Sequence, residues 1–467
     1  MKLVYQPSDR PKVGQTIIFA IQQLLAIMAA TLVVPILINL WTGADMSPAA
    51  ALFGAGVGTI VYLLFTRFKS PVFLGSSFAF LDSMPAAFAG GVTFALGYLG
   101  LIIGAVFAGL VYVVISIVVK YVGVDWINKL MPAAVIGPTV AIIGLSLAPN
   151  AIGDLKKGDV LKTIVENGEE VSVVVANPLI AVLCGLVTLF VVIICSTYGK
   201  KMAKLIPFII GILAGYTVAL IFTVIGNATG TEALMLIDFS CFTSLVEGGV
   251  GVKTFFAVPD FTFIKAFGAF GELSGSYIGA IAVAYVPVAF VVFAEHIADH
   301  KNISSIIEKD LLEDPGLHRT LLGDGVGSMA GALFGGCPNT TYGESVACVA
   351  ITGNASVITI LYAAMGAIAI AFFSPFVAFV NSIPACVMGG VCIALYGFIA
   401  VSGLKMIQNI DLGENRNLFT VSTILICGIG GLSLNFGKIS VTSTATALVL
   451  GILVNIVLKG KDGKKEE

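Results

Sequence analysis

Apolar residues occur along the chain in long continuous runs, not in the alternating pattern of strands or the stripes of surface helices. A run of about 20 apolar residues has the length of a helix that crosses a bilayer. Long spans are predicted near residues 15–40, 50–66, 95–119, 130–148, 175–196, 205–226, 279–298, 356–380, 383–404, 417–434 and 439–458. Shorter, interrupted segments lie near 74–89, 320–336 and 339–352. Together these segments predict fourteen crossings of a membrane.

A polar stretch, CPNTTYGES from Cys337 to Ser345, interrupts the apolar pattern between GALFGG and VACVAIT. Non-helical backbone at membrane depth leaves N–H and C=O groups unpaired, which is costly unless the segment is buried in protein or lines a polar cavity. A second short segment of this kind, LGSSFAF, runs from Leu74 to Phe80. The two segments can pair as short extended strands and still offer backbone donors to a ligand. Alternatively, both are turns outside the membrane, as Pro338 and Gly343 would permit.

An internal repeat supports the first interpretation. MPAAVIG at 131–137 and IPACVMG at 383–389 share Pro, Ala, Val and Gly in register, 252 residues apart, and each opens a long apolar span. Seven spans per half is an odd number, so the second copy must enter the membrane from the opposite side. Inverted repeats with interrupted helices in corresponding positions are typical of transporters whose site lies near the bilayer midplane.

Composition agrees with a polytopic membrane protein and excludes several other classes. Hydrophobic residues make up 58% of the chain and charged residues 11%, against about 25% charged in soluble domains. The net charge of -2 gives no reason to expect nucleic acid as a partner. The eight cysteines show no CxxC spacing, so neither a disulfide framework nor a zinc site is predicted. No GxSxG, HExxH or GxxxxGK[ST] motif occurs, so we expect neither an enzyme nor a cofactor.

The distribution of basic residues predicts the orientation in the membrane. The first apolar segment is too long for a signal peptide and has no clear cleavage site, so it is predicted to be a retained span. With the N-terminus inside and fourteen spans, 19 of the 25 lysines and arginines fall in inner loops and 6 in outer loops. Basic residues prefer cytoplasmic loops, so both termini are predicted to be cytoplasmic.

Acidic residues inside apolar segments are expensive and mark a functional site by default. Glu295 ends an apolar run and lies one helical turn from Asp299, so the two share a helix face. Glu344 lies in the interrupted segment. In the alternative, Glu295 and Asp299 sit at a helix end that emerges into the cytoplasm, and Asp82 either flanks the site or ends a helix. His296 and His300, four residues apart, have the spacing of metal ligands but lack an obvious third ligand.

The segments AEHIADHKNISSIIEKDLLEDPGLHR and NTTYGES resemble the signature of the nucleobase:cation symporters, also called nucleobase–ascorbate transporters, and especially of their bacterial uracil permeases. The likeness runs nearly end to end and includes LGSSFAF, the two repeat segments and LYGFIAVSG from Leu395. It implies an all-α fold of fourteen spans in a seven-plus-seven inverted repeat, with two short antiparallel strands in broken helices 3 and 10. It also implies a core domain, 1–125 and 276–381, that moves against a gate domain, 126–275 and 382–467, commonly in a homodimer.

The resemblance further implies the substrate and its site. The substrate would be uracil, imported with a proton across the cell membrane. The implied substrate-binding residues are Glu295, Glu344, Phe78, Gly343, Tyr342, Ala30 and Tyr396, with Glu344 and Asp299 in proton coupling. Uracil offers two N–H donors and two carbonyl acceptors, which carboxyl groups and strand amides can match.

Three departures from the family pattern bear on the substrate. Gln23 stands where many relatives have histidine, so the role of that imidazole is absent. Asp299 stands where the uracil permeases often have histidine and purine transporters often have aspartate, whereas Glu344 follows the uracil type. Uracil is therefore expected, with xanthine or another oxopurine as the alternative. Anion exchangers and channels share this fold, but they would need a cationic site where this sequence offers acids.

Overall fold

A computed structural model describes residues 3–123, 125–166, 169–200, 202–247, 249–408, 410–436 and 439–462. The chain divides into two compact units. The first comprises Met1–Ser146, Pro259–Ala369 and Phe398–Glu467, and the second comprises Leu147–Val258 and Ile370–Gly397. The tail beyond residue 462, which the sequence places in the cytoplasm, lies outside the described residues.

Long helices dominate the first unit. Its long helices are α1 (Val13–Thr42), α2 (Pro48–Phe65), α3 (Phe94–Val122), α13 (Gly275–Ile307) and α14 (Leu317–Gly335). The other helices of this unit are α4 (Asp125–Leu130), α5 (Ala133–Ser146), α12 (Thr262–Lys265), α15 (Gly343–Thr352), α16 (Val357–Ile370), α19 (Asn415–Ile429) and α20 (Ser443–Asp462). The short turns are η1 (Phe78–Phe80), η2 (Met84–Phe88), η4 (Ala269–Glu272) and η5 (Leu312–Gly316).

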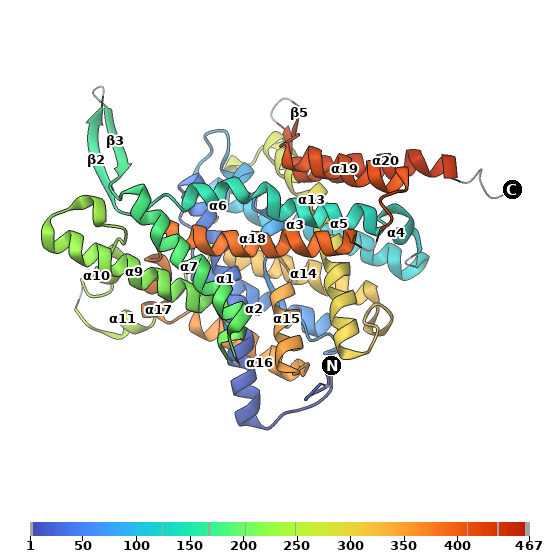
Figure 1. Cartoon of the computed structure of the whole chain (residues 1–467), viewed down its shortest axis with the longest axis horizontal. Coiled ribbons are helices and arrows are strands. Elements are labelled where there is room, and N and C mark those ends of the chain that lie inside the picture. The colour runs from blue at the N-terminus through green and yellow to red at the C-terminus, as the bar shows by residue number, and fades with distance from the viewer. Residues whose placement is uncertain are drawn as a thin grey trace. The chain divides into compact units, whose positions relative to one another are not determined.

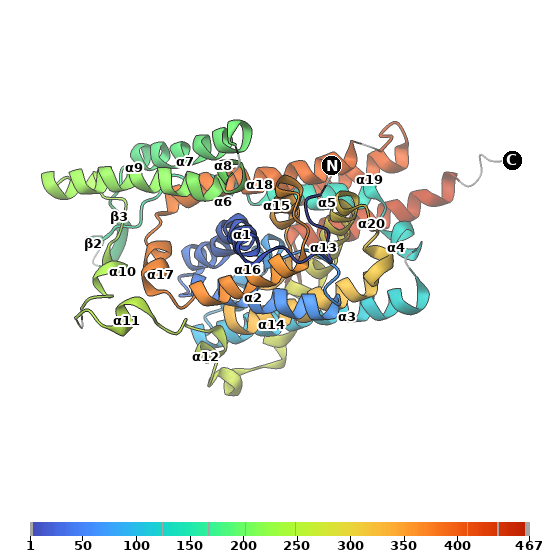
Figure 2. The same cartoon turned by 90° about the horizontal axis from the view of Figure 1, so that it is seen from below.

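Local sequence signals explain where several of these helices begin. Ser47, Thr93 and Ser274 each precede a helix and accept a hydrogen bond from a backbone N–H of its first turn. Such caps satisfy donors that a helix start leaves without an intrahelical acceptor. Inside the unit, α14 packs against both α2 and α3 (Figure 2). Glycines along α2 and α14 allow their backbones to approach closely, because a Cβ at Gly58 or Gly331 would overlap the other helix or Asn339.

A two-stranded antiparallel ladder lies within this helical unit. Strand β1 (Leu74–Ser76) pairs with β4 (Asn339–Thr341), with Leu74 opposite Thr341 and Ser76 opposite Asn339. Every residue of both strands is buried. The predicted pairing of the two interrupted segments is thus confirmed, and their central residues form buried strands instead of the turns considered as the alternative. The ladder supplies hydrogen bonds to backbone that could not stay unpaired in an apolar interior.

The second unit contains α6 (Ala148–Asp154), α7 (Pro178–Tyr198), α8 (Met202–Leu205), α9 (Pro207–Thr229), η3 (Glu232–Leu234), α10 (Ser240–Thr243), α11 (Val252–Phe255) and α17 (Ser374–Asn381). It also contains the first half of α18 (Ala385–Ile407). Strands β2 (Leu161–Glu166) and β3 (Glu169–Val174) form an antiparallel ribbon in this unit (Figure 1). At the start of α18, the N–H of Ala385 donates to Asp159 Oδ1 at 3.0 Å and the N–H of Cys386 donates to the Lys157 carbonyl at 3.0 Å.

Some predicted boundaries differ from those observed. Eight helices among the described residues are long and apolar enough to cross a membrane, and shorter apolar helices accompany them. The single span predicted at 356–380 is wrong, because the chain breaks between α16 and α17. Pro375 lies at the start of α17, where its missing N–H removes no helical hydrogen bond, so the second helix begins there. Two ribbons, β2–β3 and β5 (Leu434–Phe436) with β6 (Ile439–Val441), were not expected. The chain is nonetheless a mostly helical membrane protein, as predicted.

Candidate substrate-binding site

Each strand of the buried ladder leads directly into the start of a helix. Phe78 opens the helical turn η1 two residues after β1 ends, and Gly343 opens α15 two residues after β4 ends. The first turn of a helix leaves its N–H groups without intrahelical acceptors. Two helix starts, from segments far apart in the sequence, are therefore held next to one ladder, and the first turn of α15 supplies backbone N–H donors there. These donors are suited to the carbonyl oxygens of a small ligand.

Side-chain hydrogen bonds hold the two segments beyond the ladder itself. Ser345, in the first turn of α15, accepts a hydrogen bond from the N–H of Phe73 at 3.0 Å. Its hydroxyl also accepts one from Gln23 Nε2 of α1 at 2.5 Å. On the other side, the N–H of Ser77 donates to the Pro338 carbonyl at 2.8 Å. Gln23 thus links α1 to α15.

Tyr342 crosses the ladder with its ring. Its hydroxyl donates a hydrogen bond to the Ser76 carbonyl at 2.6 Å. The ring lies so close to Gly75 that a Cβ there would be 2.4 Å from ring carbons. Gly75 is thus required by close approach, and Tyr342 is almost fully buried. In the described structure its ring supports the strand pair, while its predicted contact with substrate stays a prediction.

Glu295 and Asp299 lie well inside α13, which continues to Ile307. They are not at the helix end, so the alternative of an emerging helix terminus is wrong. Both side chains are half-buried. Thr341 of β4 donates a hydrogen bond from Oγ1 to Asp299 Oδ2 at 2.9 Å. Helix α13 packs against both β4 and α15, so the acids lie on the helix that borders the ladder.

The structure gathers most of the predicted residues around these elements. Glu344 lies half-buried in the first turn of α15. A Cβ built on Gly343 would meet only Asp299 Oδ1, at 3.7 Å, which is ordinary contact. Ala30 is buried on α1, and Phe78 is buried at the start of η1. Tyr396 lies on the part of α18 that belongs to the second unit, and its role stays a prediction.

Among the described residues, the acids of the site, Glu295, Asp299 and Glu344, form no ion pair with a basic side chain. Carboxyl groups that are paired with no base accept hydrogen bonds when ionised and can also hold a proton. Together with the backbone donors of the two helix starts, they form a set suited to a planar, uncharged molecule that carries both N–H groups and carbonyl oxygens.

Sequence analysis missed Asp324, which the structure places in the interior next to α13. Asp324 is fully buried on α14, and its Oδ2 lies 2.6 Å from Nδ1 of His296. His296 Nε2 lies 3.0 Å from Thr320 Oγ1, and His300 contacts the hydroxyl of Tyr62 at 2.7 Å. Protein groups thus engage the imidazoles that were considered as metal ligands. The sequence did offer a signal, because Asp324 is an acid within the apolar, glycine-rich stretch GDGVGSMAG. An acid inside an apolar segment marks a functional site by default, as it does for Glu295.

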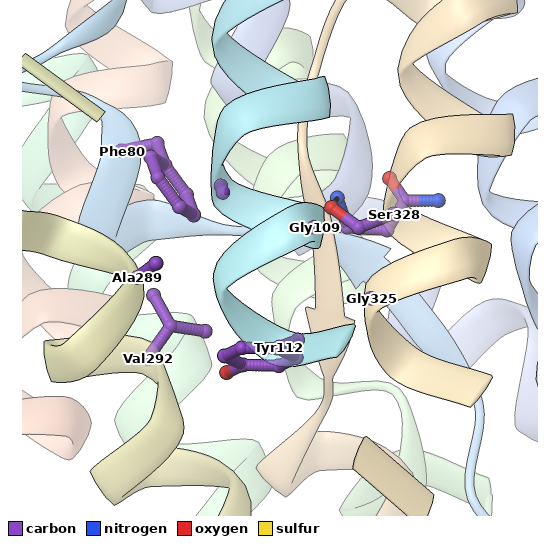
Figure 3. A pocket seen from close by; sticks show the side chains of 9 residues that line it. Phe80, Gly109, Tyr112, Ala289, Val292, Gly325 and Ser328 are labelled. Carbon is purple, nitrogen blue, oxygen red and sulfur yellow. Dashed lines mark hydrogen bonds between the residues drawn. The ribbon is translucent and has the colours of Figure 1, made fainter. Parts of the chain in front are cut away.

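A small cavity lies between α3, α13 and α14, and Tyr112 of α3 is part of its lining. It is lined by Phe80, Ala108, Gly109, Tyr112, Ala289, Val292, Gly325, Ser328 and Asn339. In Figure 3, Phe80, Ala289 and Val292 lie on one side of α3 and Ser328 lies on the other. The lining contains none of the predicted site residues, so this cavity is separate from the proposed substrate site.

Comparisons with known proteins agree with these observations. The family profile Xan_ur_permease, described as a permease family, matches residues 14–436. The chain is 38% identical over 464 residues to the uracil permease of Bacillus caldolyticus, covering 98% of this chain and 96% of that protein. It is 36% identical over 454 residues to the uracil permease of Bacillus subtilis, covering 96% and 94%. Its fold is similar to the transmembrane domain of the cyanobacterial bicarbonate transporter BicA, with a TM-score of 0.60, 14% identity and coverage of 95% and 97%.

Proposed function

Since this chain belongs to the Xan_ur_permease family, we propose that it is a uracil permease that imports its substrate together with a proton. It is a permease and not an enzyme. Uracil is proposed as the substrate because relatives such as the two Bacillus proteins are uracil permeases and align with almost the whole chain. Proton symport is inferred from the chemistry of the site.

One observation carries the proposal. Glu295 and Glu344, which form no ion pair among the described residues, lie next to a buried ladder from which two helices start. Uracil is planar and uncharged, with two N–H groups and two carbonyl oxygens. We propose that Glu295 and Glu344 accept hydrogen bonds from its N–H groups and that the backbone near Phe78 and Gly343 donates to its carbonyls. Ala30, Tyr342 and Tyr396 complete the proposed site. A charge-assisted hydrogen bond of this kind contributes about 1.5–3 kcal/mol.

The proposed architecture is an inverted repeat of seven plus seven spans. It is supported by the two repeat segments, because α5 begins at Ala133 and α18 at Ala385, the same position of each motif. It is also supported by the pairing of β1 with β4, one strand from each half. We propose alternating access by movement of a core, 1–125 and 276–381, against a gate, 126–275 and 382–467. We propose that the protein is a homodimer in the cell membrane with both termini in the cytoplasm.

A proton-coupled oxopurine permease is the second candidate. Asp299 favours it, since purine transporters of the family often have aspartate at this position. Glu344 favours uracil. Anion transport is weaker, although the similar BicA transports bicarbonate. Its identity of 14% bears on the fold alone, and the half-buried acids on α13 and at the start of α15 would repel an anion.

Uptake into proteoliposomes tests the proposal. Labelled uracil is offered with an inward proton gradient, with a protonophore, and with sodium replacing potassium. Unlabelled uracil, xanthine, hypoxanthine, uric acid and bicarbonate serve as competitors. We expect accumulation that uracil alone suppresses strongly and that the protonophore abolishes. Stronger competition by xanthine than by uracil would show that the substrate is an oxopurine. Accumulation that depends on sodium and is unaffected by the protonophore would show that the coupling ion is sodium.

A further inference from the structure

Two neighbouring faces of α13 carry different chemistry. Glu295 and Asp299 are four residues apart and share one face, and His296 and His300 share the adjacent face. The acids are half-buried at the proposed site, whereas both imidazoles are fully buried. Adjacent residues on a helix are about 100° apart around its axis. The rotation of α13 that buries the histidines therefore also fixes the direction of the acids.

His296 is anchored to α14 through both ring nitrogens. Thr320 Oγ1 donates to the Leu317 carbonyl at 3.1 Å and lies 3.0 Å from Nε2 of His296. Nδ1 lies 2.6 Å from Asp324 Oδ2. Both ring nitrogens of His296 thus have a buried polar partner on α14.

His300 is anchored to α2 in the same way. Its Nδ1 donates to the His296 carbonyl at 2.8 Å, so Nε2 is the acceptor in the neutral ring. The hydroxyl of Tyr62, on α2, lies 2.7 Å from this nitrogen and 2.7 Å from Ser70 Oγ. Tyr62 and Ser70 are fully buried. The two imidazoles also stack, with ring centroids 4.0 Å apart.

Rotation of α13 would break both anchors together. Each buried donor or acceptor left without a partner destabilises the rotated state, so the two anchors together favour one rotation of α13. We propose that His296 and His300, held by Asp324 and Tyr62, are positioning residues that fix the rotation of α13 and so present Glu295 and Asp299 to the substrate. The ligand in this inference rests on the proposed function, but the anchoring does not.

Two variants remove one anchor each. Tyr62→Phe removes the hydroxyl that lies 2.7 Å from His300 Nε2 and keeps the ring. Asp324→Leu removes the partner of His296 Nδ1 with little change in volume. For each purified variant, uracil affinity is measured by calorimetry, and hydrogen exchange of α13 is measured without ligand. We expect both variants to weaken uracil binding about tenfold, ~1.4 kcal/mol. Exchange should rise over 292–301 and stay near wild type in α3.

Two control variants separate positioning from general loss of packing. Ser116→Ala removes a partly buried hydrogen bond of 2.6 Å from α3 to the His318 carbonyl on α14, a bond in which α13 takes no part. Tyr285→Phe removes from α13 a buried hydroxyl that has no hydrogen-bond partner among the described residues. Both controls should bind uracil within about twofold of wild type, even where the thermal midpoint falls.

The outcomes are distinct. If Ser116→Ala weakens binding and loosens α13 as much as Tyr62→Phe does, the anchors are ordinary packing and the proposal is wrong. Unchanged affinity in both anchor variants, with α13 loosened, would equally overturn it. If wild type binds no uracil, the proposed function fails, and the exchange of α13 in the unliganded variants still decides whether the anchors hold it. Should Asp324→Leu not fold, Tyr62→Phe carries the test.

Discussion

Thr341 and Asp299, separated by 42 residues, are joined by a hydrogen bond of 2.9 Å from the threonine hydroxyl to a carboxyl oxygen. The bond connects β4 to α13, the two elements that supply the strand amides and the acids of the proposed site. Since Thr341 is buried and Asp299 half-buried, water cannot readily replace it. The carboxyl orientation of Asp299 is therefore set by the strand.

Thr341→Val should release Asp299 from this orientation. The change keeps the branched shape and removes the hydroxyl, so about 1.5–3 kcal/mol of a hydrogen bond to a charged group is lost when Asp299 is ionised. We expect uracil affinity to fall about tenfold or more. Thr341→Ser, which retains a hydroxyl, is the matched control and should bind nearly as wild type. Equal affinities of the valine and serine variants by calorimetry would show that the bond does not matter for binding.

Glu295→Ala should abolish measurable uracil binding while the protein still reaches the membrane. The expected loss is that of a charge-assisted hydrogen bond, about 1.5–3 kcal/mol, together with the hydration of the emptied space. Glu295→Gln keeps the size of the side chain and one hydrogen-bond acceptor, so it should lose less uracil affinity than Glu295→Ala. Calorimetry on the purified variants measures both. Near-normal affinity in the alanine variant would remove Glu295 from the site.

Alanine at Gly75 and at Gly343 should have opposite consequences. A Cβ at Gly75 would overlap the ring of Tyr342, so Gly75→Ala should lower the thermal midpoint and the yield of folded protein. A Cβ at Gly343 has room in the protein, so Gly343→Ala should fold normally. If substrate approaches the backbone at Gly343, that variant should still lose affinity. Normal folding with normal binding would place Gly343 away from the substrate.

The ladder could be predicted because two features were local. Polar, helix-breaking residues at Pro338 and Asn339 stand out against apolar flanks, and the repeat identified LGSSFAF as their counterpart. Unpaired backbone in such a place has few solutions, and pairing is one of them. The acids of α13 were visible for the same reason, since Glu295 follows an apolar run. Their position within α13 followed only from the structure.

Other features depended on long-range contacts or on signals that were not used. The pairing of Asp324 with His296 joins two helices and has no signature in either segment alone. The β2–β3 ribbon did have one, because Asn167–Gly168 between alternating residues is a strong hairpin signal. Ser374–Pro375 similarly marks a helix start inside the apolar run 356–380. Apolar composition led to the single span predicted at 356–380, whereas 161–174 lay between two predicted spans and received no assignment.

Stability should depend on pH through Asp159, which lies outside the membrane-spanning segments. Burial raises the pKa of Asp159 to about 7, opposed by the hydrogen bond from the Ala385 N–H and reinforced by the nearby charges of Asp238 and Asp154. An acid whose pKa is higher in the folded state binds more protons there than when unfolded. Its contribution to stability is therefore greatest at low pH and is lost as the pH rises through about 7.

Thermal unfolding of the purified protein between pH 5.5 and 8 checks this. Asp159→Asn should flatten the decrease of the midpoint over this range, by about 2 °C or more. Glu232→Gln alters an exposed ion pair with Lys162 in the same unit and should leave the pH dependence unchanged. An Asp159→Asn protein with the wild-type pH profile would assign the decrease to another group.

Glu344 should control the coupling of substrate transport to proton movement. Uracil is uncharged at neutral pH, so its accumulation requires a co-transported cation. Glu344 lies half-buried in the first turn of α15, next to the ladder, and joins none of the ion pairs among the described residues. A carboxyl group in this place can take up a proton from one side, hold it while the substrate completes its hydrogen bonds, and release it to the other side.

Glu344→Gln mimics the protonated acid in size and polarity but cannot release a proton. We expect uracil binding to stay within about tenfold of wild type, ~1.4 kcal/mol, while accumulation driven by a proton gradient is lost. Exchange of labelled for unlabelled uracil across a vesicle needs no net proton movement, so it should survive better than net uptake. Asp299→Asn is the comparison, because Asp299 is the second candidate for the coupling group. If Glu344→Gln concentrates uracil normally under an imposed proton gradient and Asp299→Asn does not, the coupling proton resides on α13.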